Sequence, residues 1–549
     1  MLKQEIAKQL ERVSRELWPE YSSSLSGDFF IRMVEFTKDD KYGDVTSTLA
    51  LQLAKELKSN PADVAEKIIE NLSQSFRSRF SKIETVMPGF INFTLSKKWL
   101  TRQAGLIAND SHYGKNEKNV NEKVQIEFIS ANPTGPIHVG NGRGAFLGDT
   151  LARVLSSQGA TVRKEYYVND AGNQVELLAE SVIRRYFQQN GLSVDYPERC
   201  YQGDYVKDLA KKMQLGNVRL NDINRIKRRV KTKVLKMMVA ELEKTANEVL
   251  GVKFHRWFHE SELYADGTVA SVLQELRERD LVHEEGGATW VKTSQFGDEK
   301  DRVIIKSNKE YTYFVSDIAY HWNKFVSRKF DRVINIWGAD HQGHVARMQA
   351  VKQGLGLPGQ LDIIIVQLVR LVSGGKEVRM SKRSGTFVTL AELVEDVGLD
   401  VARFFFLMRA ADTHMDFDVD LAKEKSEKNP VYYVQYAHAR ICSILKQPEL
   451  RRIQSSHANE QFDHQAEIAL IRELIKFPDL LADLSQTYEI QRLPFYTVRL
   501  AELFHAFYVH CRVIDGENVH LARLDLVKAT RNVLRMALKL MGVTAPNSM

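Results

Sequence analysis

The alternation of apolar and polar residues predicts a β-α-β unit near the end of the first quarter of the chain. VQIEFIS (124–130) and TVRKEYYV (161–168) have the composition of strands, and GAFLGDTLARVLSSQG (144–159) between them has helical spacing. Before this unit, residues 1 to about 85 have mainly helical spacing. MPGFINFTLS (87–96) then alternates like an edge strand after a Pro-Gly turn.

Three apolar, β-branched runs follow further along the chain: DRVIIKS (301–307), RVINIW (332–337) and LDIIIVQLV (361–369). Such runs suit central parallel strands that are buried on both faces. Because helical stretches separate them, the pattern predicts an α/β doubly wound parallel-sheet (Rossmann-like) domain. After about residue 415 the strands are expected to stop, and segments such as 431–445 and 498–511 predict an all-α helical bundle.

These patterns divide the chain into three expected domains. Residues 1–110 form an α+β N-terminal domain, and the polar stretch 109–123 has the composition of a linker. Residues 118–415 form the Rossmann-like domain, which charged helices interrupt as an insertion at about 185–260. Residues 416–549 form the C-terminal helical bundle.

The composition excludes several classes of protein. The chain has 549 residues, 44% apolar and 27% charged, which is typical of globular proteins. No apolar run approaches the ~20 residues of a membrane span, and the N-terminal residues lack the pattern of a secretory signal. We therefore expect a cytoplasmic protein with no membrane partner. The cysteines, Cys200, Cys442 and Cys511, lie far apart and predict neither a disulfide framework nor a zinc site.

A glycine-rich segment, SANPTGPIHVGNGRG (130–144), lies between a predicted strand and a predicted helix. A nucleotide triphosphate needs close approach of the backbone, hydrogen-bond donors and the positive end of a helix. Gly140, Gly142 and Gly144 allow the approach, and His138 offers an imidazole N–H. The plainer alternative is a glycine-rich connection with an unrelated histidine.

Within this segment, GNGRGA (140–145) also matches the dinucleotide-binding fingerprint, with Glu165 twenty residues further on. That fingerprint places its first glycine in the tight turn directly after the strand. Here residues 130–139, two prolines among them, separate the strand from Gly140. The sequence therefore disfavours a nicotinamide cofactor.

A second segment, SGGKEVRMSKRSGTFVTL (373–390), follows the strand predicted at 361–369. Its glycines and basic residues predict a cationic loop, and Lys382 is suited to the negative charge that develops in phosphoryl chemistry. A solvated basic hairpin is the alternative. The net charge of +7 permits a polyanionic partner without demanding one.

These two segments resemble the paired motifs of class I aminoacyl-tRNA synthetases. HVGN (138–141) resembles the HIGH motif and RMSKR (379–383) resembles the KMSKS loop, 244 residues apart when counted from His138 to Lys382. The context SANPTGPIHVGNGRG, the segment PGFINF (88–93) and the chain end LRMALKLMGVTAPNSM resemble arginyl-tRNA synthetases. The resemblance covers essentially the whole chain. It departs from the motifs at Asn141, in place of the second histidine of HIGH, and at Arg379, in place of the first lysine of KMSKS.

The resemblance implies roles for individual residues. The implied catalytic residues are His138, Asn141 and Lys382. The implied ATP-binding residues are Pro136, His138, Gly140, Asn141, Asp340, Met380, Ser381 and Lys382. The HIGH-like region comprises Ala131, Asn132, Pro133, Thr134, Gly135, Pro136, Ile137, His138, Val139, Gly140 and Asn141. The implied arginine-binding residues are Glu127, Ser130, Asn132, Tyr313, Asp317, His341 and Gln342.

The chemistry of arginine agrees with these assignments. A guanidinium stays charged at physiological pH and presents a planar fork of donors, which carboxylates match best. The i, i+4 spacing of Tyr313 and Asp317 would place both on one face of a helix, and Asn132 is implied to hold the α-amino group. The alternative is that Glu127 is an ordinary strand residue and Tyr313 belongs to the core.

GADHQGH (338–344) follows the strand predicted at 332–337, which is the position expected for an active-site rim. Asp340, His341 and Gln342 could each contact the ATP ribose or arginine, and the sequence does not assign them. Asp340, His341 and His344 could also suggest a metal site, but a cluster without thiolates more often binds substrate.

For tRNA, the resemblance implies that the N-terminal domain contacts the D-loop, with Phe90 and Asn92 touching a base. An aromatic ring can stack on an unpaired base while an amide reads its edge. The C-terminal bundle is implied to hold the anticodon, with Tyr432, Tyr436 and Arg440 as weaker candidates. Phe90 and the helical aromatic residues could instead belong to cores.

The function implied is that of an arginine–tRNA ligase, whose partners are tRNA(Arg), L-arginine and ATP with Mg²⁺, without zinc, in a chain expected to be monomeric. The family also implies that tRNA must bind before arginine is activated. Two alternatives remain. The class I cysteine enzyme uses zinc with cysteine ligands, which the dispersed cysteines do not supply. A non-catalytic RNA-binding relative would not need His138 and Lys382.

Overall fold

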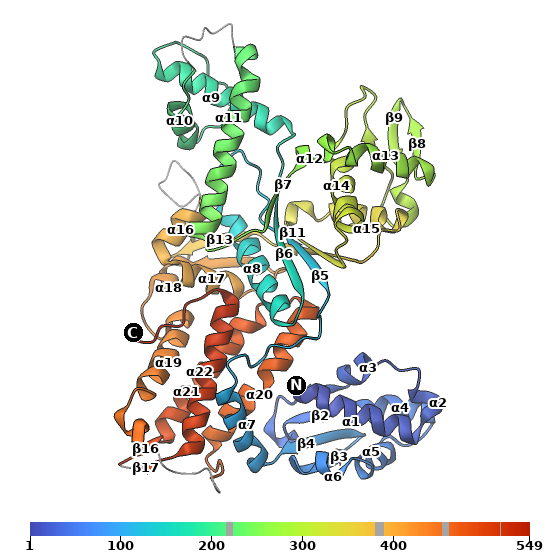
Figure 1. Cartoon of the computed structure of the whole chain (residues 1–549), viewed down its shortest axis with the longest axis vertical. Helices are drawn as coiled ribbons and strands as arrows, with labels where there is room; N and C mark the ends of the chain where they lie inside the picture. The colour runs from blue at the N-terminus through green and yellow to red at the C-terminus, as the bar shows by residue number, and fades with distance from the viewer. Residues whose placement is uncertain (216–222, 379–388, 453–459, 517) are drawn as a thin grey trace.

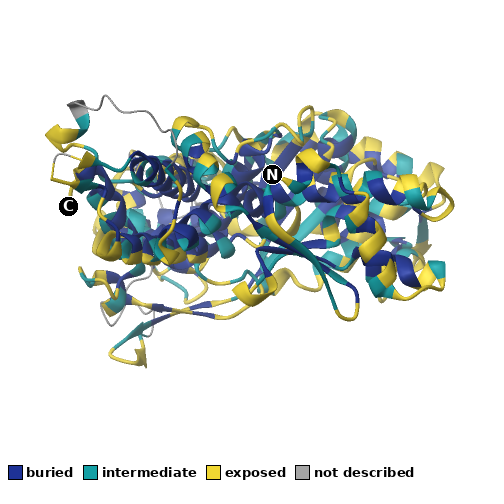
Figure 2. Cartoon of the chain, turned by 90° about the horizontal axis from the view of Figure 1, so that it is seen from below, coloured by how far each residue is buried: buried dark blue, intermediate teal, exposed yellow. Residues whose placement is uncertain are grey.

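A computed structural model describes residues 1–215, 223–378, 389–452, 460–516 and 518–549 (Figure 1). The parallel sheet lies in the middle, between a projecting group of helices, α9 to α11, and the helical bundle of α19 to α22. The first hundred residues form a separate α+β unit beside this bundle. Across the described residues, the buried positions line the inner faces of the helices and sheets, as the dark blue segments of Figure 2 show.

The N-terminal unit is an antiparallel sheet of order β1-β2-β4-β3 covered by helices. Its elements are α1 (Leu2–Leu17), α2 (Pro19–Ser22), α3 (Gly27–Arg32), β1 (Val34–Phe36), η1 (Asp40–Tyr42), β2 (Val45–Ser47), α4 (Leu49–Leu57), α5 (Pro61–Glu70), α6 (Gln74–Arg77), β3 (Phe80–Val86) and β4 (Phe90–Leu95). Because β4 pairs with β2 and β3, the prediction of an edge strand at 87–96 is wrong. Period-two alternation identifies a strand but carries no information about its neighbours.

The Rossmann-like sheet is entirely parallel, with the order β12-β11-β5-β6-β7. Its strands are β5 (Lys123–Glu127), β6 (Thr161–Val168), β7 (Arg256–His259), β11 (Arg332–Gly338) and β12 (Gln360–Val366). After β5 the chain passes through η2 (Val139–Asn141) and α8 (Gly142–Ser157) to β6 on one side, and later returns to β11 on the other. The strand order therefore reverses between β5 and β11, where doubly wound sheets bind their ligands.

Two sequence-based expectations for this domain are wrong. Residues 301–307 do not join the parallel sheet, because β10 (Arg302–Ile305) lies at the edge of a small antiparallel sheet with β9 (Ala288–Val291) and β8 (Val282–Glu285). The strand predicted at 361–369 is β12, an edge strand of the parallel sheet rather than a central one. A short β-branched run is compatible with either environment, so its composition does not reveal its partners.

The remaining elements of the middle part cover the sheet and carry the insertion. They are α9 (Asn173–Gln189), α10 (Asp204–Lys211), α11 (Ile223–Lys244), the π-helix η4 (Thr245–Val249), α12 (Glu260–Ala265), α13 (Thr268–Glu278), η5 (Thr293–Phe296), α14 (Tyr313–Trp322), the π-helix η6 (Asn323–Ser327), η7 (Ala339–His341) and α15 (His344–Gly354). Helices α9, α10 and α11 share a small apolar core of their own.

The C-terminal part contains more strand than the sequence pattern predicts. Its elements are β13 (Val369–Ser373), β14 (Lys376–Glu377), α16 (Leu390–Val397), α17 (Leu399–Leu407), β15 (Met415–Asp418), α18 (Val419–Lys423), α19 (Pro430–Ile444), η8 (Pro448–Arg452), α20 (Gln465–Thr487), α21 (Arg492–His510), β16 (Ile514–Asp515), β17 (Asn518–Val519) and α22 (Leu521–Met541). The expectation that strands stop after 415 is therefore wrong for β15 and for the hairpin of β16 and β17. Helix α7 (Lys97–Asn109) packs on α22 and α20. The domain boundaries proposed from the sequence stay predictions.

A buried ion pair joins the helix that follows β5 of the parallel sheet to the segments around the bundle. Arg403 of α17 lies 2.8 Å from Asp149 of α8, and both side chains are almost fully buried. Arg403 also donates to the carbonyl oxygens of Met541, at the end of α22, and of Leu250, after α11. Burial alone would raise the pKa of Asp149, but Arg403, Lys164 and Arg153 together hold that pKa below its usual range. This contact connects α8 to three distant segments of the chain.

Among the described residues, no helix is long and apolar enough to cross a membrane.

Close packing of α8 against Phe128, the residue after β5, gives a testable prediction. A Cβ atom added at Gly148 would lie 2.4 Å from the ring of Phe128, whereas one added at Gly144, one turn earlier, would lie 3.7 Å from Ile336. We expect Gly148→Ala to lower the free energy of unfolding by about 1–3 kcal/mol, the usual cost of overpacking. Gly144→Ala is the matched control and should not destabilise, since alanine favours a helix by about 1 kcal/mol over glycine. Scanning calorimetry that found the two variants equally stable would contradict this packing.

Candidate active site

A cavity of about 680 Å³ lies at the carboxyl ends of β5, β6 and β11, at the point where the strand order reverses. The structure brings nine of the sequence-predicted residues to its wall: Glu127, Ser130, Ala131, Asn132, Asn141, Tyr313, Asp317, Asp340 and His341. It adds side chains that the sequence analysis did not select for this site, among them Tyr167, Asn169, Gln174, Glu260 and Trp337, and also His344, which the sequence analysis considered only for a possible metal site. The cavity is therefore lined by several carboxylates and by aromatic and amide side chains.

The backbone turns sharply after β5 and fixes the first group of side chains. Ile129 and Ser130 have φ angles of 66° and 40°, in the left-handed region that non-glycine residues rarely occupy. The turn directs the Ser130 hydroxyl to donate to Glu127 Oε1 at 3.2 Å and to accept from the backbone N–H of Tyr167 at 3.1 Å. One end of the Glu127 carboxylate is thus oriented by local structure.

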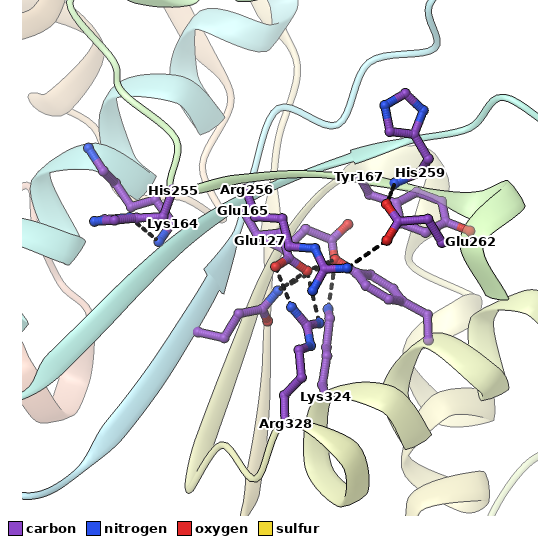
Figure 3. Close-up of polar contacts among 12 residues, drawn as sticks. Glu127, Lys164, Glu165, Tyr167, His255, Arg256, His259, Glu262, Lys324 and Arg328 are labelled. Atoms are coloured by element: carbon purple, nitrogen blue, oxygen red, sulfur yellow. Dashed lines mark hydrogen bonds and ion pairs between the residues drawn. The ribbon is translucent and has the colours of Figure 1, made fainter. Parts of the chain in front are cut away.

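The other end of the Glu127 carboxylate meets a buried lysine. Lys324 Nζ, from η6, lies 2.6 Å from Glu127 Oε2. Its neighbour Arg328 pairs with Glu165 of β6, which also accepts a hydrogen bond from the Tyr320 hydroxyl at 2.5 Å. Figure 3 shows Lys324 and Arg328 pointing together toward the two glutamates of the sheet. Each buried carboxylate at this strand end therefore has its own cation.

Helix α14 supplies the second carboxylate of the cavity wall. Tyr313 and Asp317 both line the cavity, as their i, i+4 spacing predicts, and the Tyr313 side chain is exposed. Asp317 Oδ2 lies 2.8 Å from His344 Nε2 at the start of α15, and its side chain remains about one-third exposed. Asp317 therefore presents a hydrogen-bonded but accessible carboxylate to the cavity.

His321, one turn after Asp317, is buried and neutral. Burial, together with the nearby charge of Lys324, holds the pKa of His321 well below its usual range. Its Nδ1 donates to the Asp317 carbonyl at 2.7 Å, and its Nε2 accepts from the Asn335 amide at 2.8 Å. His321 therefore links α14 to the central strand β11 as an uncharged imidazole.

Glu260, the first residue of α12 directly after β7, forms part of the cavity wall. Its side chain is almost fully buried, and Ser316 donates a hydrogen bond to its Oε1 at 2.7 Å. Burial and the neighbouring carboxylates of Asp317 and Asp170 raise the pKa of Glu260. A cation bound in the cavity would lower the pKa of Glu260 and favour its ionised form.

The HVGN segment adjoins the cavity through Asn141. The backbone N–H of Gly140 donates to His138 Nδ1 at 3.1 Å, and Asn141 Oδ1 accepts from the backbone N–H of His138 at 3.2 Å. Because Nδ1 is an acceptor, the ring proton lies on Nε2, and partial burial lowers the pKa of His138. His138 is therefore a neutral imidazole with an N–H donor at an exposed position. Pro136, His138, Gly140 and Gln342 are not among the residues of the cavity wall.

The second predicted motif is described only at its edges. Met380, Ser381 and Lys382 lie outside the described residues, which end at Val378 and resume at Thr389. Thr389 pairs with His138 as an isolated bridge, and the backbone N–H of Leu390 donates to the Ile137 carbonyl at 2.9 Å. The chain that follows the RMSKR segment thus lies directly beside the HVGN segment.

The candidate RNA-contacting residues have different environments. Phe90 is half-buried, and Asn92 is 3% exposed, with Oδ1 accepting a hydrogen bond from Thr46 at 2.7 Å. On α19, the rings of Tyr432 and Tyr436 are parallel at 6.4 Å, and the Arg440 guanidinium lies 4.7 Å from both the Tyr436 ring and the Tyr508 ring. Tyr508 of α21, which the sequence analysis missed, extends this cluster.

The described parts of the chain contain no group of three or more His, Cys, Asp or Glu side chains that could hold a metal ion.

Comparison with known proteins identifies the family. Residues 1–95 match the arginyl tRNA synthetase N terminal domain, residues 103–422 the catalytic domain of class I (R) tRNA synthetases, and residues 434–549 the DALR anticodon binding domain. The chain belongs to the arginyl-tRNA synthetase family. It is 44% identical to the arginine–tRNA ligase of Heliobacterium modesticaldum over 94% of this chain and 93% of that one. It is 45% identical to the corresponding ligase of Desulforamulus reducens over 94% and 93%. Among solved structures, the Thermus thermophilus arginyl-tRNA synthetase shares its fold, with a TM-score of 0.73, 22% identity and coverage of 100% of both chains.

The buried, neutral His321 predicts how stability changes with pH in this family member. Its folded pKa lies well below 6.5, so on acidification below about pH 6.5 the unfolded chain binds a proton that the folded chain does not. Folding stability should therefore fall with decreasing pH, by up to about 1.4 kcal/mol per pH unit for this group. His321→Gln should lose less stability between pH 7 and 5.5 than the wild type, while the surface variant His112→Gln should keep the wild-type slope. Identical slopes in all three proteins, measured by urea unfolding, would show that His321 is not the group responsible.

Proposed function

We propose that this chain is an arginine–tRNA ligase that activates arginine with ATP and transfers it to the 3′ end of tRNA(Arg). The observation that carries the proposal is the cavity at the strand-order reversal, where Glu127, Tyr313 and Asp317 converge beside the HVGN segment. Three family-model matches that together span most of the chain support it. Ligases with this activity are also found among its relatives.

Arginine binds with its guanidinium toward Asp317 and Tyr313 and its α-amino group toward Asn132. Asp317 is accessible and its orientation is held by His344, so it can accept two parallel N–H bonds from a planar fork. Glu127 and Ser130, oriented by the turn after β5, provide further acceptors on the same side. His341 and Asp340 lie at the rim, while Gln342 would reach the substrate only from the loop that follows them.

ATP binds across the HVGN segment, at the amino end of α8. The positive end of that helix and the N–H on Nε2 of neutral His138 both suit phosphate oxygens. Asn141, which lines the cavity, and the backbone around Pro136 and Gly140 complete this side. Lys382, Ser381 and Met380 are assigned to the same phosphates from the sequence alone. Mg²⁺ would enter with the nucleotide, since it is usually held by phosphates with only one or two carboxylates.

The reaction has two steps. The arginine carboxylate attacks the α-phosphorus of ATP in line, which forms arginyl-adenylate and releases pyrophosphate. A hydroxyl of the terminal tRNA ribose then attacks the adenylate carbonyl, which forms the ester and releases AMP. Both steps need reactants held in register and cations or N–H donors where negative charge develops, and neither needs a protein nucleophile.

tRNA is proposed to contact both ends of the chain. The cluster of Tyr432, Tyr436 and Arg440 presents an aromatic and cationic surface of the kind that stacks on unpaired bases, and Tyr508 extends it. Phe90 and Asn92 remain the candidates for the D-loop, although Asn92 would have to expose its amide to read a base edge. The monomeric state and the cytoplasmic location expected from the sequence stay predictions.

A pyrophosphate-exchange assay with each amino acid, run with and without tRNA, tests the proposal. We expect pyrophosphate exchange with arginine and with no other amino acid, and only when tRNA is present. Exchange that depends on cysteine or another amino acid would assign the chain to a different class I enzyme. Binding of tRNA without exchange for any amino acid would make it a non-catalytic relative.

Substitution of Asp317 gives a second prediction. Asp317→Asn removes one charge from a charge-assisted pair, which costs roughly 1.5–3 kcal/mol, so arginine affinity should fall about ten- to a hundredfold. ATP affinity should stay within about twofold, because Asp317 lies on α14 and none of its described hydrogen bonds involves the HVGN segment. Calorimetric titration of both ligands checks this, with the surface variant Asp280→Asn as the matched control. An equal loss of ATP affinity would show that Asp317 supports the whole site and does not contact arginine.

A further inference from the structure

Glu127 faces the cavity, and its ion-pair partner, Lys324, does not line the cavity. Lys324 is completely buried, lies 2.6 Å from Glu127 Oε2 and is not part of the cavity wall. The two residues are 197 positions apart, so the pair exists only in the folded chain. The carboxylate therefore meets substrate on one side and a fixed positive charge on the other.

Lys324 is held firmly in this position. Its Nζ donates to Asn335 Oδ1 of β11 at 2.9 Å and lies 4.0 Å from the centre of the Tyr320 ring. It belongs to η6, the π-helical turn that continues α14, and such turns often occur at functional sites. The other carboxylate nearby, Glu165, already pairs with Arg328. Glu127 is therefore the group that balances the charge of Lys324.

The cavity wall includes the carboxylates of Glu127, Glu260, Asp317 and Asp340, which differ in their partners. Glu127 is balanced by Lys324, and Asp340 lies exposed at the rim beside His341. Glu260 is buried and receives a hydrogen bond from Ser316. Asp317 is hydrogen-bonded to a histidine and has no lysine or arginine partner among the described ion pairs. Asp317 is thus accessible and uncompensated, and Glu260, whose Oε2 has no hydrogen-bond partner, is a second cavity carboxylate without a lysine or arginine partner among the described ion pairs.

We propose that Lys324 is a positioning and specificity-determining residue, which turns Glu127 into an oriented hydrogen-bond acceptor without net charge and leaves Asp317 to attract the substrate cation. This inference rests on the proposed function, with arginine as the substrate. The guanidinium then meets Asp317 and Glu260, which have no lysine or arginine partner among the described ion pairs. Because Lys324 neutralises Glu127, that carboxylate offers no charge to a compact ammonium group, and the planar fork of the guanidinium favours arginine over lysine at Asp317.

Paired substitutions test this division of roles. Glu127→Gln/Lys324→Met removes both charges together, which buried ion pairs often tolerate without loss of stability, so the double variant is expected to fold. Its dissociation constant for arginine should stay within about fivefold of the wild type, whereas Asp317→Asn should weaken arginine by about ten- to a hundredfold. Isothermal titration without ATP measures both. A loss of tenfold or more in the double variant would show that the charge of Glu127 itself binds arginine, and would overturn the proposal.

Lys324→Met alone provides the readout that a structural role would not give. It leaves Glu127 without its cation, so a ligand ammonium group gains a charged acceptor that does not require a planar fork, and the preference for arginine over lysine should fall by at least about fivefold. An unchanged preference would also overturn the assignment of Lys324. A wild-type chain that did not prefer arginine over lysine and citrulline would refute the proposed substrate. If the wild type preferred arginine but the double variant lost arginine affinity tenfold or more, the role of Lys324 would be refuted and the proposed function would stand.

Discussion

The position of β5 in the sheet is the constraint on which the rest of the site depends. β5 pairs in parallel with β6 on one side and β11 on the other, so the connections leaving its neighbours diverge and open a space at its carboxyl end. The chain fills the edge of this space with the left-handed turn at Ile129 and Ser130 and with the HVGN segment. Glu127 is the last residue of β5, and its place at the strand end makes it both buried and accessible from the cavity.

Helix α8 transmits this arrangement to distant parts of the chain. Arg143 in its first turn is buried and donates to the carbonyl oxygens of Gln367, Thr413 and Ala410, which lie near the ends of β12 and α17. Two turns later, Asp149 binds Arg403, which also contacts the end of α22. Because breaking a buried ion pair is costly, this contact couples the end of α22 to α8, the helix beside the site.

The sequence predicted correctly those elements and residues that depend only on neighbouring positions in the chain. The strands β5 and β6 and the helix α8 appear where the apolar spacing places them, and the i, i+4 spacing correctly brought Tyr313 and Asp317 to one wall. The short run that became β10 was misplaced, because strand pairing depends on partners far away in sequence. Lys324 was missed for the same reason. Lys324 follows Asp317 by seven residues, but its role depends on the ion pair with Glu127, which is distant in sequence and forms only in the folded chain.

A crystal structure with a non-hydrolysable arginyl-adenylate analogue tests the central claim most directly, because the analogue carries both halves of the site in one molecule. Our account predicts that its guanidinium lies within about 3 Å of the Asp317 carboxylate, with the phosphate mimic near His138 and the amino end of α8. Lys324 should remain bound to Glu127 in that complex. An analogue whose guanidinium pointed away from α14, or that displaced Lys324 from Glu127, would contradict the account.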